Sequence, residues 1–419
     1  MRVLIVVAPV TAHLFPSVPL AQALQSAGHE VRVASNTSMG DRISGAGLTA
    51  VGIGDDTPAP PNVSKEDLDR FTEALGFEPG SWFDRIWQAT GFYTMGSCTR
   101  VHPDADGRAL LADNLVAFAR QWRPDLVVWD QASPIGAIAT REAGAASARL
   151  MWGPDYFGWV HWRLTERIAR GELQTNPLAE ILAPVFERFD YDYSEDLLLG
   201  DFTVDPNPMQ LPRPAGHHAV PMQWVPYTSS APVQEWLLQP PSRPRVCLSL
   251  GVTARTFFAG RDERVAAVFD AVADMDVEVV ATVNADQLGD DSKVPDNVRI
   301  LDYVPLTQVI PSCSAVIHHG GYGTAFTAGA HRVPQLTVME EWGSALCVTP
   351  YLEARGAGVT IHADGLTAEK VHHELSRLLT EPEFQQGAAR VQADLAGAPS
   401  PTEIVPILER LTAQYRTRD

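Results

Sequence analysis

The chain has 419 residues, a formal net charge of −19 and a hydrophobic fraction of 45%. That length exceeds what one compact core usually holds, so two domains are expected. The negative charge argues against nucleic-acid and anionic-membrane partners, and no apolar run approaches membrane-spanning length. The four cysteines lack the spacing of a zinc site or a disulfide framework, which fits a reducing cytoplasm.

The first elements that the sequence predicts are a strand over Val3–Ala8, a helix centred on Leu20–Leu24 and a strand over Glu30–Ala34. This order of strand, helix and strand predicts an α/β fold with a parallel sheet and helices on both faces. The first turn contains no glycine. The glycine fingerprint of dinucleotide-binding oxidoreductases is therefore absent.

His13 lies in this turn, between the first strand and its helix. Ligands of open α/β sheets bind at the carboxyl ends of strands, so His13 is placed to face a cleft. A neutral imidazole near pH 7 suits a general base. A helix-capping or merely exposed histidine would occupy the same place, and position alone leaves both interpretations open.

Aromatic residues gather between residues 82 and 93. Such rings can line a pocket for a large flat or greasy molecule, although they more often belong to a core. The candidates are Trp82, Phe83, Trp87, Phe92 and Tyr93. Further on, a predicted strand has Asp130 at its carboxyl end. The carboxylates of DYDYSEDLLLGD alternate with aromatic residues, which favours a solvated face, and no metal site is predicted.

Proline recurs between residues 205 and 245 without strand or helix periodicity, which predicts a stiff linker. A second alternation of strands and helices follows it. We therefore expect one Rossmann-like domain over residues 1–210, a linker over 211–244 and a second Rossmann-like domain over 245–400. A terminal helix then follows in 401–419.

The most informative stretch is Val316–Gln335, VIHHGGYGTAFTAGAHRVPQ. It predicts a short strand, a tight turn and a helix whose N-terminus offers free backbone N–H groups to an anion. Two adjacent histidines at a strand end do not suit mere packing. The predicted phosphate-binding residues are His319, Gly320, Gly321, Gly323 and Thr324.

Two further strand ends in this half carry candidate contacts. The first strand ends at Gly251, and Thr253 follows it as a second candidate phosphate contact. Another strand ends near Tyr303, where that side chain and the backbone of Val304 could hold a flat base.

Five segments together resemble a known family: HLFPSVPLAQALQSAGHEV, RPDLVVWD, RLMWGPD, PDNVRILDYVP and HHGGYGT. They are similar to segments of the GT-B glycosyltransferases that attach deoxysugars to bacterial natural products, above all the subgroup acting on macrolide and aromatic polyketide aglycones. The resemblance implies two Rossmann-like domains facing a cleft. The first would bind the acceptor and the second the nucleotide-sugar donor, with the terminal helix packing back on the first.

The resemblance also implies roles for the candidate residues. His13 matches the base that deprotonates the acceptor hydroxyl, and Asp130 is the candidate that orients it. The glycine-rich turn, with Thr253, matches the pyrophosphate site, and Tyr303 and Val304 match the site of the nucleobase, usually thymidine. The expected chemistry is inversion at the anomeric carbon, with a TDP-sugar as co-substrate and neither metal nor resident cofactor.

The sequence departs from the family at one donor contact. Relatives usually carry Trp-Asp where this chain has Trp342 and Gly343, and that Asp contacts sugar hydroxyls. Glu340 and Glu341 are candidate substitutes, and Glu341 is the one we assign to the donor. The alternative is a heavily deoxygenated donor sugar with fewer hydroxyls to hold. The identity of the sugar is therefore left open, as are the aglycone and its hydroxyl.

The resemblance further suggests a partner, because members of this subgroup often depend on an auxiliary protein resembling a cytochrome monooxygenase. A homodimer is left open. Two alternatives to a transferase remain at this point: a nucleotide-sugar epimerase of the same architecture, and a non-catalytic binding protein. An epimerase would need catalytic carboxylates beside the donor sugar and would leave the aromatic run without a task.

Overall fold

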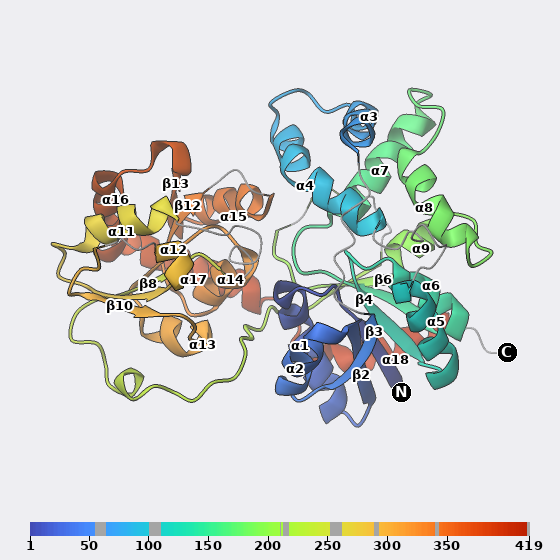
Figure 1. Cartoon of the computed structure of the whole chain (residues 1–419), viewed down its shortest axis with the longest axis horizontal. Helices are drawn as coiled ribbons and strands as arrows, with labels where there is room; N and C mark the ends of the chain where they lie inside the picture. Colours follow the sequence, from blue (N-terminus) through green and yellow to red (C-terminus); the bar gives the residue numbers. More distant parts are fainter. Residues whose placement is uncertain are drawn as a thin grey trace. The chain divides into compact units, whose positions relative to one another are not determined.

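The computed structural model describes residues 1–54, 64–99, 110–209, 211–212, 218–251, 262–288, 293–339 and 343–416. The chain forms two compact units. The first comprises Met1–Gln223 and Pro399–Asp419, and the second comprises Trp224–Ala398. Each unit is built on one parallel sheet covered by helices (Figure 1), which confirms the prediction of two Rossmann-like α/β halves.

The sheet of the first unit has seven strands in the order β3-β2-β1-β4-β5-β6-β7. Its strands are β1 (Arg2–Val6), β2 (Glu30–Asn36), β3 (Thr49–Gly54), β4 (Leu126–Asp130), β5 (Ala146–Leu150), β6 (Phe202–Asp205) and β7 (Ala219–Pro221). Strands β4 and β5 are buried along their whole length, as expected for central parallel strands with helices on both faces. The register pairs Val6 with Trp129 and Asp130 with Leu150. The carboxyl ends of β1, β4 and β5 therefore meet at one edge.

The helices of the first unit are α1 (Thr11–Ser26), α2 (Gly40–Gly45), α3 (Lys65–Leu75), α4 (Trp82–Thr99), α5 (Leu110–Trp122), α6 (Ile135–Ala143), α7 (Tyr156–Ala169), α8 (Pro177–Glu187), α9 (Glu195–Leu199) and α18 (Pro401–Tyr415), with the 3-10 turn η1 (Thr37–Met39). Helices α3, α4, α7 and α8 pack on one another, away from the sheet (Figure 1). Two arginines of α7 connect it to α3. Arg163 and Arg167 donate hydrogen bonds to carbonyls at the C-terminal end of α3.

Helix α18 packs against α1 and β5, so the end of the chain belongs to the first unit. Ser400 and Glu403 form a capping box at its start. His29 lies 3.1 Å from the carboxylate of Glu409, and Arg416 forms an ion pair with Asp125.

The second unit has six parallel strands in the order β10-β9-β8-β11-β12-β13. They are β8 (Arg245–Ser249), β9 (Glu278–Thr282), β10 (Val298–Leu301), β11 (Ala315–His318), β12 (Gln335–Met339) and β13 (Gly358–His362). The helices are α11 (Glu263–Val272), α12 (Ala285–Leu288), α13 (Leu306–Val309), α14 (Tyr322–Ala330), α15 (Gly343–Ala354), α16 (Ala368–Thr380) and α17 (Pro382–Ala396), with 3-10 turns η2 (Glu235–Leu238), η3 (Ile310–Ser312) and η4 (Ala363–Gly365).

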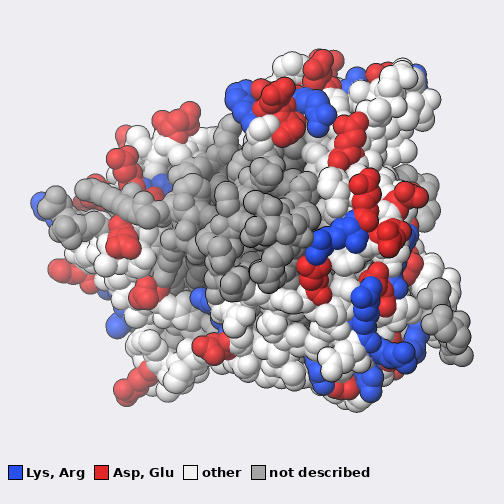
Figure 2. Space-filling model, turned by 45° about the vertical axis from the view of Figure 1, so that its right-hand side comes forward, with Lys and Arg blue, Asp and Glu red and all other residues white. Residues whose placement is uncertain are grey.

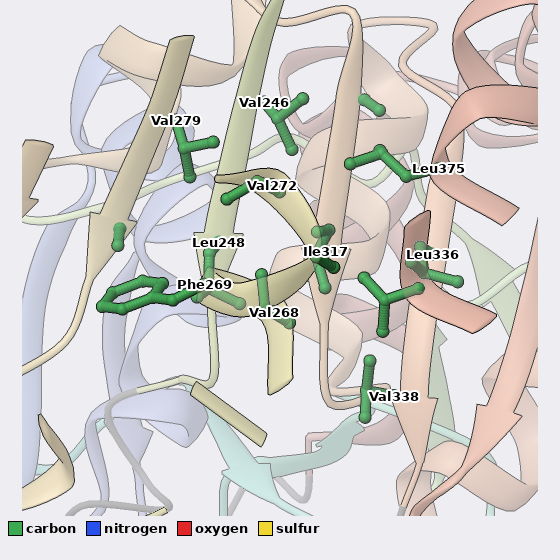
Figure 3. Packing of buried hydrophobic residues seen from close by; sticks show 14 of the residues in the cluster. Val246, Leu248, Val268, Phe269, Val272, Val279, Ile317, Leu336, Val338 and Leu375 are labelled. Atoms are coloured by element: carbon green, nitrogen blue, oxygen red, sulfur yellow. The ribbon is translucent and has the colours of Figure 1, made fainter. Parts of the chain in front are cut away.

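The core of the second unit lies between this sheet and the helices α11 and α16. Figure 3 shows Leu248 of β8 and Ile317 of β11 facing Val268 and Phe269 of α11, with Leu375 of α16 beside them. Burying such side chains is the main favourable contribution to folding, on the order of 1.5–3 kcal/mol each. The packed core holds β8 and β11 in register, which fixes where their carboxyl ends lie.

The predicted linker differs from the observed division. Residues 211–244 span the boundary, and those from Trp224 onward belong to the second unit. Thr228 shares a hydrogen bond of 2.8 Å with Thr307, and Gln308 donates to the carbonyl of Ala231. This part of the proline-rich stretch is therefore attached to the rest of the second unit by hydrogen bonds. Its composition did not indicate these bonds.

Figure 2 shows acidic and basic side chains close together over part of one face of the molecule. Several form ion pairs between elements, among them Arg120 with Glu142 and Arg141 with Asp196. Within the described residues, no helix is long and apolar enough to cross a membrane.

Candidate active site

In the first unit, the structure brings together the two predicted catalytic residues. His13 lies in the first turn of α1, and Asp130 is the last residue of β4. The imidazole Nδ1 and the carboxylate Oδ2 are 2.5 Å apart, and the two residues are 7% and 3% exposed. The N-cap of α1 is Val10, without a side-chain cap. The interpretation of His13 as a capping or exposed histidine is therefore wrong.

Asp130 accepts hydrogen bonds on both carboxylate oxygens. Oδ2 accepts from His13 and from the N–H of Ala8, at 3.2 Å. Oδ1 accepts from the N–H of Ala132 and from the indole N–H of Trp152, each at 2.8 Å. Burial alone would raise the pKa of Asp130, but the attraction of His13 and these hydrogen bonds outweigh it and hold the pKa below its usual value.

An ionised Asp130 determines the tautomer of His13. A carboxylate without a proton can only accept, so the hydrogen bond of 2.5 Å requires the proton on Nδ1. Nε2 then carries the lone pair and is the nitrogen able to take a proton from another group. This is the arrangement of a general base held by a carboxylate.

In the second unit, the predicted phosphate turn joins β11 to α14. Gly320 has a φ of +91°, and a Cβ there would lie 2.6 Å from the Cβ of Ala345. Only glycine fits both requirements. Helix α14 begins after Gly321, its N-cap, which makes no side-chain cap hydrogen bond. The N-terminal end of such a helix carries the partial positive charge that favours an anion.

His319 is held between two glycines. β8 pairs with β11, with His318 opposite Ser249, and this places Gly251 beside the imidazole of His319. A Cβ on Gly251 would lie 2.4 Å from Cε1, and one on Gly321 would lie 2.7 Å from Nε2. The absence of a Cβ at both glycines lets the backbone approach the ring on two sides. Gly251 also has a φ of +80°, a conformation that favours glycine. The sequence predicted it only as part of a candidate phosphate contact with Thr253, not as a neighbour of His319.

The electrostatic setting of His319 keeps its imidazole neutral. Burial, then the positive charge of Arg264, lower the pKa of His319 to about 4, against a smaller opposing interaction with the backbone of Ser249. Its Nδ1 is buried and makes no geometrically complete hydrogen bond within the described residues. A neutral imidazole still carries one N–H and can donate it to a phosphate oxygen.

His318 had no predicted role of its own. Its side chain supports the glycine-rich turn through hydrogen bonds. Its Nδ1 accepts the N–H of Gly320 at 3.0 Å, and its Nε2 lies 2.9 Å from the amide oxygen of Gln335. The amide of Gln335 donates in turn to the carbonyl of Ala325 in α14. Since Nδ1 accepts, the proton must sit on Nε2. Burial, and then the neighbouring His319, lower the pKa of His318 to about 3.

This network predicts a loss of stability in mild acid. Folded His318 stays neutral down to about pH 3, whereas the unfolded chain binds a proton near 6.5. Because the unfolded state binds the extra proton between these values, the free energy of unfolding should fall as pH falls, by about 1.4 kcal/mol per unit for this group. Urea unfolding at pH 7 and pH 5 measures it.

The matched variant is His318→Asn, whose side-chain oxygen can still accept the N–H of Gly320 but does not titrate. Other histidines with lowered pKa, His29 and His161 among them, act equally in both proteins. The pH slope of His318→Asn should therefore be shallower than that of the wild type. Equal slopes would show that His318 is not held neutral.

The other predicted donor residues have different surroundings. Tyr303 is 39% exposed, and its hydroxyl lies 2.5 Å from that of Ser229. Val304 is buried in the core, so only its backbone is available. Thr324 is buried in the first turn of α14, and a Cβ on Gly323 would have no atom of the described part of the chain within 4 Å. Thr253, Glu340, Glu341 and Trp342 lie outside the described residues.

The predicted acceptor residues separate into a core residue and a partly exposed group. Trp87 is 1% exposed, stacks on Phe71 and donates to Thr72, so it is a core residue rather than a pocket lining. Trp82 and Phe83 are partly buried, and the ring of Phe83 lies 5.6 Å from that of Trp159. The side chains of Phe92 and Tyr93 lie outside the described part of α4.

No group of three or more His, Cys, Asp or Glu side chains is arranged to hold a metal ion in the part of the chain that the structure describes. The acidic stretch at 190–201 is engaged otherwise. Asp196 is paired with Arg141, and Asp201 accepts the N–H of Ser147.

Comparisons with known proteins show which family the chain resembles. The N-terminal domain of the erythromycin biosynthesis protein CIII-like family matches residues 22–251, and its C-terminal domain matches 266–411. The aclacinomycin-T 2-deoxy-L-fucose transferase of Streptomyces galilaeus is 39% identical over 99% of this chain and 97% of its own. The 10-deoxymethynolide desosaminyltransferase of Streptomyces venezuelae is 37% identical over 99% and 98%.

Solved structures agree. The glycosyltransferase VinC, in complex with DTDP, has a TM-score of 0.81 and 34% identity, over 99% of this chain and all of its own. Both halves of the chain, their order and their folds thus match glycosyltransferases. The chain therefore belongs to the erythromycin biosynthesis protein CIII-like family, and it is a glycosyltransferase of the GT-B fold.

Proposed function

We propose that this glycosyltransferase moves a deoxysugar from a thymidine diphosphate donor to a hydroxyl of a polyketide aglycone in antibiotic biosynthesis. The observation that carries the proposal is the pair of His13 and Asp130, buried and 2.5 Å apart, in a chain of this family. The names of the two relatives supply the acceptor class and the sugar class, and the ligand of VinC supplies the nucleotide.

The proposed reaction is a single displacement. Nε2 of His13 takes the proton of the acceptor hydroxyl while Asp130 stabilises the imidazolium that forms. The acceptor oxygen forms a bond to the anomeric carbon as the bond from that carbon to the diphosphate oxygen breaks. Attack from the face opposite the leaving group inverts the configuration, and the thymidine diphosphate departs with the bonding electrons.

The leaving diphosphate needs stabilisation as its charge grows. We assign this task to the N-terminal N–H groups of α14 and to the neutral imidazole of His319, which are fixed before the reaction by the glycines around them. These groups do the work that a divalent cation does in other transferases. The proposal accordingly includes no metal, and turnover should survive a chelator.

The proposal is tested by calorimetry with thymidine diphosphate and by product analysis with TDP-deoxysugars and a panel of macrolide and aromatic aglycones. Binding of thymidine diphosphate and an inverted anomeric linkage in the product are the expected results. Tight binding of another nucleotide alone would overturn the donor class. The epimerase and non-catalytic interpretations predict no transfer to any aglycone, and binding of no nucleotide would overturn the transferase proposal.

We also propose that the chain works with an auxiliary protein resembling a cytochrome monooxygenase, which the sequence resemblance to its subgroup supports. The purified chain alone should then turn over slowly, and co-expression with such a protein should raise its specific activity. Full activity of the purified chain alone would contradict this. Light scattering on the same sample distinguishes a monomer from the homodimer that the sequence leaves open.

A further inference from the structure

We propose that Trp152 is a positioning residue for the catalytic pair, holding Asp130 through its indole N–H and His13 through its ring. This inference rests on the proposed role of His13 as the base. Trp152 follows the end of β5, next to β4 in the sheet, and the pairing of Asp130 with Leu150 brings its indole to the carboxylate. Trp152 belongs to the segment RLMWGPD, and the sequence predicted no separate role for it.

The hydrogen bonds of Asp130 show what the indole contributes. Among the described residues it has four donors, and two of them, Ala8 and Ala132, are backbone N–H groups at the carboxyl ends of β1 and β4. The other two are side chains, His13 on Oδ2 and Trp152 on Oδ1. A carboxylate can rotate about its Cβ–Cγ bond. The indole donor opposes that rotation and keeps Oδ2 directed at Nδ1 of His13.

The ring of Trp152 makes a second, independent contact with the pair. Its centroid lies 4.5 Å from that of the His13 imidazole, at an interplanar angle of 45°. An imidazole that turned about its own Cβ–Cγ bond would break the hydrogen bond to Asp130 and redirect Nε2. The large flat indole occupies the space needed for that turn, so it holds the ring in the orientation in which Nε2 remains the base.

The indole also moderates the charge on Asp130. His13 is the titratable group whose charge acts on this carboxylate, and the indole N–H stabilises the ionised form from the other side. Without that donor, the negative charge of Asp130 is less stabilised, so the carboxylate attracts the proton that it shares with His13 more strongly. The acidic limb of the pH–rate profile should then move to higher pH.

The experiment compares Trp152→Phe, which keeps a ring and removes the donor, with Trp129→Phe as the matched control. Trp129 is a neighbouring buried tryptophan on β4 whose indole donates to Ser147, away from the pair. For Trp152→Phe we expect kcat to fall about 10-fold, the size of one hydrogen bond to a charged group. The acidic limb of kcat/KM should move upward, with the KM for the donor unchanged.

Trp129→Phe should keep the wild-type pH profile even if it unfolds more easily. Identical profiles for Trp152→Phe and the wild type would overturn the inference, as would equal effects of the two substitutions. Adding Trp152→Phe to His13→Ala should change nothing further, because the residue acts through the imidazole. Full activity of His13→Ala would instead overturn the proposed function, so the two failures can be told apart.

Discussion

His13→Ala and Asp130→Asn are each expected to lower kcat about 10²-fold to 10⁴-fold, the range that general-base catalysis supplies. The reason differs between them. His13→Ala removes the base. Asp130→Asn keeps the shape of the side chain but replaces one acceptor oxygen by an NH2 group, which donates. Binding of thymidine diphosphate should persist in both variants, because the groups assigned to the diphosphate lie in the second unit.

The amide of Asp130→Asn cannot satisfy the donors around it. With its NH2 group in the place of Oδ1, it faces the N–H groups of Ala132 and Trp152. With the NH2 group in the place of Oδ2, it donates to Nδ1 of His13, which moves the proton to Nε2 and removes the base. Either orientation leaves donors facing each other, so some loss of stability should accompany the loss of turnover.

The control for these variants is His161→Ala. His161 is a second buried histidine of the first unit, 6% exposed and hydrogen-bonded to Tyr193, and it has no part in the proposed reaction. It reports what losing a buried imidazole costs in folding alone. If His161→Ala lowers kcat as much as His13→Ala does, the assigned role of His13 is wrong.

The second large effect is expected at the phosphate turn. Gly321→Ala should weaken binding of thymidine diphosphate about 100-fold, because its Cβ would lie 2.7 Å from Nε2 of His319 and must push the imidazole away. That loss corresponds to about two hydrogen bonds, one of them to a charged group. Calorimetry measures the affinity, and thermal unfolding of the unbound protein measures the accompanying strain.

Gly323→Ala is the matched substitution. Gly323 lies two residues further along the chain, in the first turn of α14. No atom of the described residues lies within 4 Å of the Cβ it would carry, so the unbound protein should fold at least as stably as the wild type. The diphosphate is proposed to lie over this turn, and the methyl group should therefore cost about 10-fold in affinity without a cost in stability. Wild-type affinity in both variants would place the donor elsewhere.

The sequence predicted the parts of the site that depend on local pattern. A strand followed by glycines and a helix predicts an anion site whatever surrounds it, and His319 and Gly320 follow from that. His13 and Asp130 each lie at the carboxyl end of a predicted strand. That these two strands are neighbours is a property of the sheet order, which the structure shows. The resemblance supplied only Asp130 as the candidate that orients His13.

What sequence reasoning missed are contacts between segments that are distant in the chain. Gly251 lies beside His319 only because β8 pairs with β11, and Trp152 reaches Asp130 only because β5 pairs with β4. Trp87 was assigned to a pocket because composition does not tell which side of a helix faces inward. Phe71 and Thr72, which contact Trp87, belong to a different helix, α3. These contacts form only in the folded chain.

The place where the chain leaves and rejoins the first unit has a consequence for protein engineering. The backbone N–H of Gln223 donates to the carbonyl of Pro399 at 2.7 Å, so the two ends that flank Trp224–Ala398 are tied together. A segment whose flanks are adjacent can be exchanged as a single cassette without cutting a sheet. Grafting this cassette between relatives would transplant all of β8–β13 and leave β1–β7 with their own α18.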